Sequence, residues 1–385
     1  MSSDGSGRFS LGWVAYAALG ALVAALVIFF GGGYGGRAVA AQFTELPRGL
    51  AFSSEGVVHF HALGSGEYFF AGGGSVSFVG RDGVVAWEYT TTLSGAAGSY
   101  SVGDMLLVYE PLGVQLYVFS PEGLLHSQNL SGDVMRVGLG PSGAAGVILR
   151  TQAGYETHLF DESGASTVNV IHSDPGVFPT AVAISDDGEL AALALMDAGG
   201  VGLRSVIELY RNEIGGGISG RLQYDDDEAI ALLLFMDDAS LVAFSDRAVH
   251  SFNLEEDTRD SMPLVNRVSM LNRMGTNGFV IAFGEGMPGA EAERAGTVVG
   301  FNSALNELLR FQTDKNITHL FASQSGVVVG AGRSIYGLAP GGRLLWSFDA
   351  TQDFSHALML ENRDTILFVT RAEARVLRQG SRFWG

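Results

Sequence analysis

Apolar residues between positions 41 and 385 occur in short runs or alternate with polar residues, and turns rich in Gly, Asp, Ser or Pro separate these runs. Because a strand points successive side chains to opposite faces, this pattern predicts strands rather than helices. After the glycine-rich stretch 31–36, no segment predicts a helix longer than a turn or two. The pattern predicts an all-β chain.

One unit repeats: an alternating strand, a turn with glycine, and a second strand. Four copies are clear, and their turn glycines are Gly83, Gly123, Gly164 and Gly342. The first two spacings are 40 and 41 residues, and the third, 178, equals four further units of about 44. Weaker copies fill the long gap, at residues 204–216, 248–260 and 297–311.

Each period also contains an earlier strand pair, most clearly TAVAISDDGELAALAL (180–195), with a turn at Asp187-Gly188. Four strands in each period of 40–50 residues are typical of a β-propeller. Eight blades are favoured over seven, in a domain spanning residues 49–385. The predicted units start near residues 57, 97, 132, 178, 226, 267, 316 and 355.

The eighth unit is incomplete. It supplies strands near Ala357–Leu360, Thr365–Thr370 and Arg375–Leu377 and no clear fourth. An unpaired sheet edge exposes backbone hydrogen-bonding groups. We therefore expect Gly49–Glu55 to provide the outer strand of this blade, so that the two ends of the domain close the ring.

The N-terminal region has a different character. Leu11–Phe30 comprises 20 residues without a charge, enough for a helix about 30 Å long, with Trp13 and Tyr16 near one end and Tyr34 just beyond the other. It predicts a transmembrane signal anchor (11–30) in contact with membrane lipid, after a short cytoplasmic tail (1–10) and before a glycine-rich linker (31–48). The alternatives are a signal peptide cleaved after Ala40 and a buried core helix. We expect the propeller on the extracytoplasmic side of the cell membrane.

Charge and composition exclude several classes of function. The 23 basic and 41 acidic residues give a net charge of −18, which disfavours nucleic acid and anionic membrane surfaces as partners. The absence of cysteine excludes disulfides, thiolate zinc sites and cysteine nucleophiles. The negative charge suits a protein partner with a basic or neutral face.

The repeats resemble those of PQQ-type, BamB-like eight-bladed propellers, which end in Gly-x-x-x-Trp. Gly83 to Trp87 and Gly342 to Trp346 match that pattern, whereas Ser127 occupies the equivalent place in another unit. The segment AVAISDDGELAAL is similar to the turn of WD40 and TolB-like blades. An anchor followed by such blades resembles the uncharacterised bacterial family DUF5711. These resemblances imply a fold and no activity.

Four features carry candidate chemistry. The segment 137–143 contains G-x-G-x-x-G, but a strand follows where a dinucleotide site needs a helix, so we interpret it as a turn. We interpret the acidic cluster Asp225–Glu228 as a solvated turn rather than a calcium site, and Asp186-Asp187 and Asp237-Asp238 likewise. The loop 284–296 is the longest insertion and is interpreted as a mobile decoration.

His59 and His61 lie two apart on a predicted strand, so both point to one face and could chelate a metal. No third ligand at an obvious spacing accompanies them, and we expect no metal, cofactor or catalytic residue. The predicted function is a non-catalytic, membrane-tethered interaction or scaffolding module of the cell envelope. The alternatives are a glycan hydrolase or lyase with its site in the propeller channel, and a sensor of a small ligand.

Overall fold

The computed structural model describes residues 42–52, 58–93, 97–200, 202–224, 228–276, 278–286, 296–360, 363–371 and 373–380. The predicted tail, transmembrane helix and most of the linker lie outside these residues. Within them, no helix is both long and apolar enough to cross a membrane.

The described chain folds into eight four-stranded antiparallel sheets, the blades, of which seven are meanders of consecutive strands and the eighth combines β1 with the last three strands. The strands of blades 1 to 4 are β2 (His59–Ala62), β3 (Tyr68–Gly72), β4 (Ser75–Val79), β5 (Val85–Thr90); β6 (Gly98–Val102), β7 (Met105–Tyr109), β8 (Gln115–Ser120), β9 (Gly123–Asn129); β10 (Asp133–Leu139), β11 (Ala145–Thr151), β12 (Gly154–Phe160), β13 (Ser166–His172); β14 (Val177–Ile184), β15 (Leu190–Asp197), β16 (Arg204–Arg211), β17 (Ile218–Tyr224).

The strands of blades 5 to 8 are β18 (Ile230–Phe235), β19 (Ser240–Ser245), β20 (Ala248–Asn253), β21 (Thr258–Pro263); β22 (Asn266–Arg273), β23 (Phe279–Gly286), β24 (Thr297–Phe301), β25 (Glu307–Gln312); β26 (Ile317–Ser323), β27 (Gly326–Ala331), β28 (Ser334–Leu338), β29 (Leu344–Asp349); β30 (His356–Met359), β31 (Thr365–Val369), β32 (Glu373–Gln379), β1 (Phe43–Ala51).

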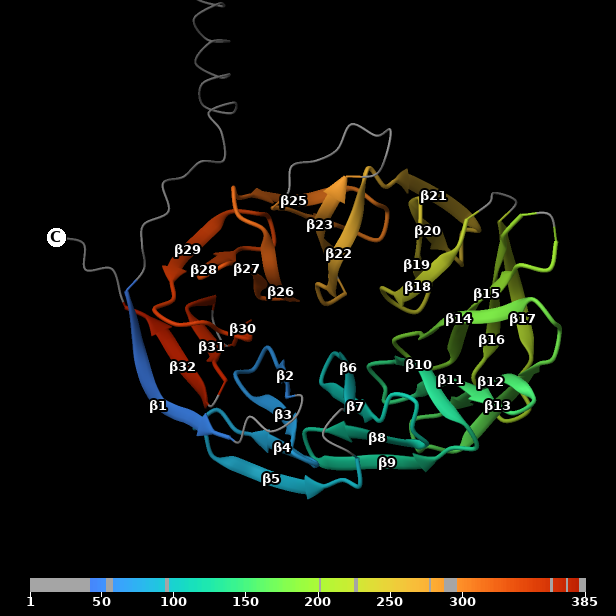
Figure 1. Cartoon of the computed structure of the whole chain (residues 1–385), viewed down its shortest axis with the longest axis horizontal. Coiled ribbons are helices and arrows are strands. Elements are labelled where there is room, and N and C mark those ends of the chain that lie inside the picture. The colour runs from blue at the N-terminus through green and yellow to red at the C-terminus, as the bar shows by residue number, and fades with distance from the viewer. Residues whose placement is uncertain are drawn as a thin grey trace, which may run out of the picture. The chain divides into compact units, whose positions relative to one another are not determined.

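The first strand of each blade lies nearest the axis of the ring (Figure 1). These innermost strands begin at residues 59, 98, 133, 177, 230, 266, 317 and 356, within four residues of the predicted unit starts. Neighbouring innermost strands contact each other, for example β10 with β14 and β26 with β30. The eight-bladed all-β propeller predicted from the sequence is confirmed.

The eighth blade joins the two ends of the domain. Its order is β1-β32-β31-β30, so the N-terminal strand pairs antiparallel with the last strand of the chain. The predicted closure is correct, but its strand is Phe43–Ala51 and not Gly49–Glu55. The earlier start has a packing reason, since the Phe43 ring meets the edges of Trp346 and Phe348 at 5.3 Å between centroids.

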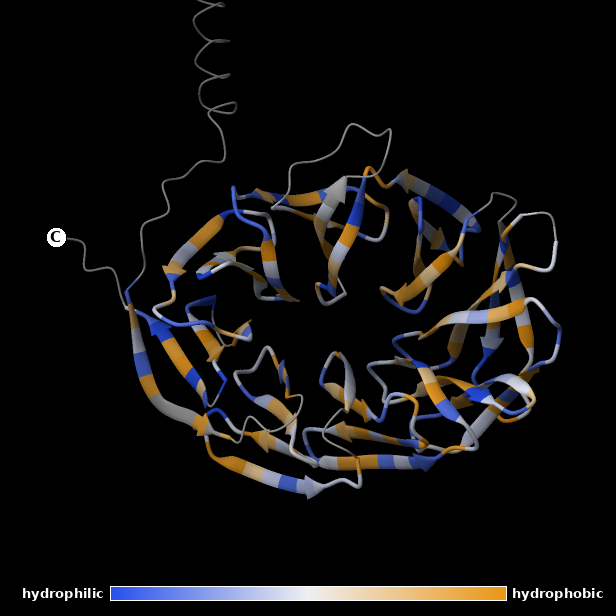
Figure 2. Ribbon diagram, viewed as in Figure 1, coloured by the Kyte–Doolittle hydropathy of each residue, from blue (hydrophilic) through white to orange (hydrophobic). Residues whose placement is uncertain are grey.

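The core lies between the blades. One cluster joins Leu107 of blade 2 to Val147 of blade 3, and another joins Ala192 of blade 4 to Leu241 of blade 5; all four side chains are fully buried. Figure 2 shows apolar residues on the strands and a largely hydrophilic outer strand β21. Apolar burial between sheets, at about 25 cal/mol per Å², holds the blades together.

The two tryptophans of the Gly-x-x-x-Trp pattern link neighbouring blades. Trp87 on β5 donates from Nε1 to the Pro121 carbonyl of blade 2 at 2.7 Å. Trp346 on β29 donates to the Arg363 carbonyl of blade 8, also at 2.7 Å. The turn glycines Gly83 and Gly342 have φ values of 78° and 79°, a region that favours glycine.

Candidate interaction face

The meander topology gives the propeller two unlike faces. Turns between the first and second strands of every blade, and between the third and fourth strands of blades 1 to 7, lie at one end of the sheets. We call this end the hairpin face. Turns between the second and third strands, and the connections between blades, form the opposite face.

The two faces differ in charge over the described residues. The turns of the hairpin face contain three arginines, Arg81, Arg343 and Arg363, against sixteen acidic residues. The acidic residues are Glu67, Asp82, Asp104, Glu122, Asp161, Glu162, Asp186, Asp187, Glu189, Glu213, Asp237, Asp238, Glu255, Glu256, Asp257 and Asp364. The turns and connections of the opposite face contain six acidic and four basic residues among those described.

Some of these carboxylates stabilise the turns in which they lie. Asp82 Oδ1 accepts from the Val84 amide at 3.0 Å, and Asp237 Oδ1 accepts from Ser240 at 2.6 Å. Such bonds explain aspartate in tight turns without any partner. They do not explain Glu162, Glu213 or the other glutamates apart from Glu67, which accepts from Ser65 in its own turn and pairs with Arg81. The glutamates therefore add charge beyond what turn formation requires.

Exposed apolar side chains also occur on the rim of the hairpin face, in blades 1, 2, 4 and 6. Ile214 is 81% exposed and Val84 is 60% exposed, and each lies in a turn before an outer strand. The others on this rim, near the starts of outer strands, are Val85, Leu125, Ile218 and Leu308. The opposite face has Leu112, Val114 and Ile171. Exposed apolar groups ringed by polar ones are typical of protein-binding surfaces.

The interpretation of Asp186 as solvated is wrong. Arg273, at the end of β22 in blade 6, donates from one terminal nitrogen to both Asp186 oxygens, at 2.9 and 2.8 Å, and to the Met236 carbonyl. Asp186 belongs to blade 4 and Met236 to blade 5, so the Arg273 side chain connects blades 4, 5 and 6 by hydrogen bonds. Asp187 is joined to the same junction, because its amide donates to Asp238 Oδ1 at 2.7 Å.

The interpretation of the acidic cluster as a solvated turn is also wrong for Glu228. It is 8% exposed and accepts from His250 Nε2 at 2.7 Å, whereas Asp225–Asp227 lie outside the described residues. Burial alone would raise the pKa of Glu228, but hydrogen bonds from Ser245 and His250 outweigh it and lower the pKa. Ser205 donates to the Glu228 carbonyl at 2.7 Å, so the group connects blades 4 and 5.

His59 and His61 point to one face of β2, as predicted, but they contact backbone. Their Nε2 atoms lie 2.8 Å from the Ala97 carbonyl and 2.9 Å from the Gly103 carbonyl of blade 2. Over the described ranges, no group of three His, Asp or Glu side chains could hold a metal ion. The two histidines join blades 1 and 2.

The segment 137–143 forms a strand end and a turn, because β10 ends at Leu139 and β11 begins at Ala145. The interpretation as a turn is confirmed. Of the predicted loop 284–296, residues 284–286 belong to β23, and residues 287–295 lie outside the described chain.

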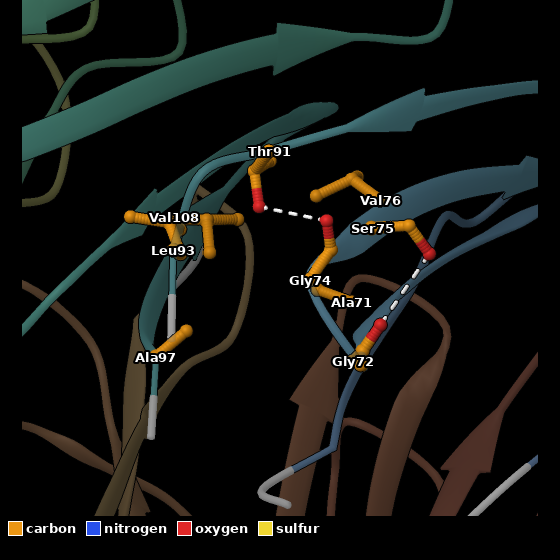
Figure 3. A pocket seen from close by; sticks show the side chains of 10 residues that line it. Ala71, Gly72, Gly74, Ser75, Val76, Thr91, Leu93, Ala97 and Val108 are labelled. Atoms are coloured by element: carbon orange, nitrogen blue, oxygen red, sulfur yellow. Dashed lines mark hydrogen bonds between the residues drawn. The ribbon is translucent and has the colours of Figure 1, made fainter. Parts of the chain in front are cut away.

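A small, shallow pocket lies between blades 1 and 2 on the opposite face, beside the Gly73-Gly74 turn (Figure 3). The backbone oxygen of Gly74 accepts from the Thr91 hydroxyl at 3.0 Å. The lining includes Leu93, Ala97 and Val108 and contains no charged side chain. It has none of the converging polar groups typical of a catalytic pocket.

The sequence could not show which acids share a face, because that depends on strand order. The signal was nevertheless present, since Glu122 and Glu162 each lie two residues after the end of a third strand. The ion pair of Arg273 with Asp186 joins residues 87 positions apart and leaves no local pattern.

A family model described as "Family of unknown function (DUF5711)" matches residues 63–378. The search of curated proteins found no match. Among solved structures, the chain is similar to Raptor from Chaetomium thermophilum, with a TM-score of 0.47 and 8% identity over 90% of this chain. The chain spans about 30% of the length of that Raptor chain.

Two other solved structures are similar at comparable levels. BBS1N, solved in complex with ARL6DN, has a TM-score of 0.46 and 11% identity, covering 90% of this chain and 99% of that chain. The Pan2 WD40 domain from Neurospora crassa has a TM-score of 0.44 and 11% identity, covering 74% and 90% respectively.

Proposed function

We propose that this chain, a member of the family of unknown function DUF5711, is a non-catalytic interaction module. It binds a basic protein partner through the hairpin face. The observation that carries the proposal is the coincidence of excess negative charge and exposed apolar side chains on one face. Charge sets the rate and orientation of encounter, and apolar contacts such as Ile214 supply affinity.

Membrane tethering belongs to the same proposal. The apolar stretch Leu11–Phe30 supports it, as does the glycine-rich linker. The chain enters the propeller on the hairpin face, since Phe43 pairs with Gln379 at the end of β32. A tether raises the effective concentration of the face for other membrane proteins. We infer a scaffolding role in the cell envelope.

The enzymatic alternative has less support. A glycosidase in the channel needs two carboxylates about 5–10 Å apart. The eight innermost strands carry one, Asp133, and Arg150 occupies it at 2.9 Å. In the described chain, no pair of acids therefore converges from these strands.

Charge neutralisation tests the proposed face. The variant Glu162→Gln, Glu213→Gln, Glu255→Gln changes three hairpin-face glutamates that have no side-chain bond among the described contacts. We expect the yield of partner proteins cross-linked to this variant in membranes to fall several-fold or to vanish. The interaction of the wild-type chain should weaken as the salt concentration rises.

The matched control neutralises three acids of the opposite face, Glu110→Gln, Asp174→Asn and Asp314→Asn. It should retain the cross-linked partners. Equal loss in both variants, or retention in both, would refute a role for the hairpin face.

A further inference from the structure

The turn between β16 and β17, residues 212–217, carries the most exposed large apolar side chain of the described chain. Ile214 is 81% exposed in this turn, and Ile218 at the start of β17 is 47% exposed. Neither side chain belongs to the apolar clusters that pack between blades 3, 4 and 5. Ile214 can therefore be buried only against another molecule.

Hydrogen bonds to blade 3 hold this turn in place. Asn212, which is 6% exposed, donates from Nδ2 to the Phe160 carbonyl oxygen at 3.2 Å. The Thr167 hydroxyl donates to Asn212 Oδ1, and the Thr167 carbonyl oxygen accepts from the Gly215 amide at 3.3 Å. The backbone is thus fixed on both sides of Ile214. A partner that binds this side chain loses little free energy to ordering the turn.

The surroundings of Ile214 are acidic. Glu213 precedes it, and Glu162 lies in the blade 3 turn that directly follows β12. Glu189 is also close, because its carbonyl oxygen accepts from the first amide of the 212–217 turn at 2.8 Å. The three glutamates are exposed. Arg211, which directly precedes the turn, leaves the local charge negative.

The acidic residues of the hairpin face lie on one side of the ring. Among its described turns, those of blades 1 to 5 contain fifteen of the sixteen acids and one arginine, Arg81; we call these turns the acidic arc. The described turns of blades 6 to 8 contain one acid, Asp364, and two arginines, and Glu361 lies outside the described residues. Leu308 of blade 6 is 37% exposed on the same rim. It differs from Ile214 in lying outside the acidic arc.

We propose that Ile214 anchors the partner of the hairpin face, and that this partner is a folded protein with an apolar pocket rimmed by lysine or arginine side chains. The proposal rests on the proposed function of that face. A single protruding side chain is fully shielded from water only inside a pocket, and a basic rim complements the glutamates around Ile214. A second copy of this chain does not fit, since both copies carry −18.

The test places a photoreactive amino acid at Ala165 in the full chain in membranes. Ala165 is exposed in the blade 3 turn, so this position reports binding while Ile214 is varied. We expect Ile214→Ala to lower the yield of the cross-linked partner about tenfold. Ile214→Val should keep most of the yield. Ile214→Trp should lower it, because an indole overfills a pocket shaped for isoleucine.

Leu308→Ala is the matched control, because it truncates an exposed apolar residue of the same rim outside the acidic arc. It should leave the yield unchanged. Both side chains are exposed, so neither truncation should affect folding. A wild-type yield for Ile214→Ala, or equal losses for the two truncations, overturns the anchor. A yield for Ile214→Trp at or above that of wild type overturns the pocket.

Failure of the anchor and failure of the proposed function give different results. A partner that is linked through position 165 whatever residue stands at 214 leaves the hairpin face as the binding surface and removes the anchor. No partner at position 165, with partners still linked at 84, has the same meaning. No partner at positions 165, 214 and 84 refutes the proposed function, and the anchor with it.

Discussion

At the scale of single residues, close approaches and buried rings decide where the chain tolerates change. Gly337 on β28 faces the ring of Trp346, which is 1% exposed and fixed by its bond to Arg363. A Cβ at Gly337 would lie 2.1 Å from the indole. The packing of blade 7 therefore requires glycine at this position.

Gly337→Ala should destabilise the propeller by about 3 kcal/mol, because the indole cannot move without losing its hydrogen bond and its contacts. Gly341→Ala is the matched control, since a Cβ there meets nothing within 4 Å. Urea denaturation followed by tryptophan fluorescence measures both. A Gly337→Ala variant as stable as wild type would show that Trp346 does not occupy this position.

Buried histidines also make stability depend on pH. Burial lowers the pKa values of His61, His126, His172, His319 and His356, the last to about 4. The unfolded chain, with histidine pKa values near 6.5, then binds more protons than the native one. Stability must fall as pH drops below about 6.5.

We expect the urea midpoint to decrease from pH 7 to pH 5, with His356 alone contributing about 2 kcal/mol of that loss. His356→Gln should flatten the dependence. A midpoint that stays constant or rises over this interval would contradict the burial of these rings.

At the scale of the elements, the strand β1 completes the blade that closes the ring. Leu46 and Leu50 pack with Phe43 against the cluster that contains Val376 and Trp346. Its pairing shifts register between Leu46 and Leu50. Without β1, the outer edge of β32 and part of this cluster would face water.

Deleting residues 43–51 should lower the free energy of unfolding by at least about 3 kcal/mol, through lost ladder bonds and apolar burial. A chain that begins at residue 42 keeps β1 and is the control. Thermal unfolding of the two truncated chains measures the difference. Equal midpoints would mean that β1 does not close the ring.

The elements were largely predictable because local chemistry specifies them. Gly83 and Gly342 mark turns that need positive φ, and alternation marks the strands that they join. The bounds of β1 were missed because its apolar positions match a partner more than 300 residues away, as in the pairing of Phe43 with Gln379. The buried state of Glu228 was missed because it depends on His250 in a neighbouring strand.

At the scale of the whole molecule, the ring separates its charges. Acidic residues gather in the turns of one face, whereas the innermost strands contain three arginines and four histidines and a single carboxylate. Neither arrangement is needed to bury the apolar strands. Both follow from strand order, which brings residues from eight blades to one end or to the centre.

The N-terminal segment makes a prediction of its own. If Leu11–Phe30 spans the bilayer, the full chain should stay in the membrane pellet after a carbonate wash and keep its N-terminus. Immunoblotting of tagged chain and N-terminal sequencing measure this. Soluble protein that starts at Ala41 would show cleavage after Ala40 instead.

The central claim is that the hairpin face binds a protein partner, and site-specific photo-crosslinking tests it most directly. A photoreactive amino acid replaces Ile214 or Val84 on the hairpin face, and Ile171 or Leu112 on the opposite face; all four are exposed apolar side chains. We predict that light will link a discrete protein to positions 214 and 84 in membranes, and none to positions 171 and 112. Cross-links from the opposite face alone, or equal cross-linking from both, would contradict the account.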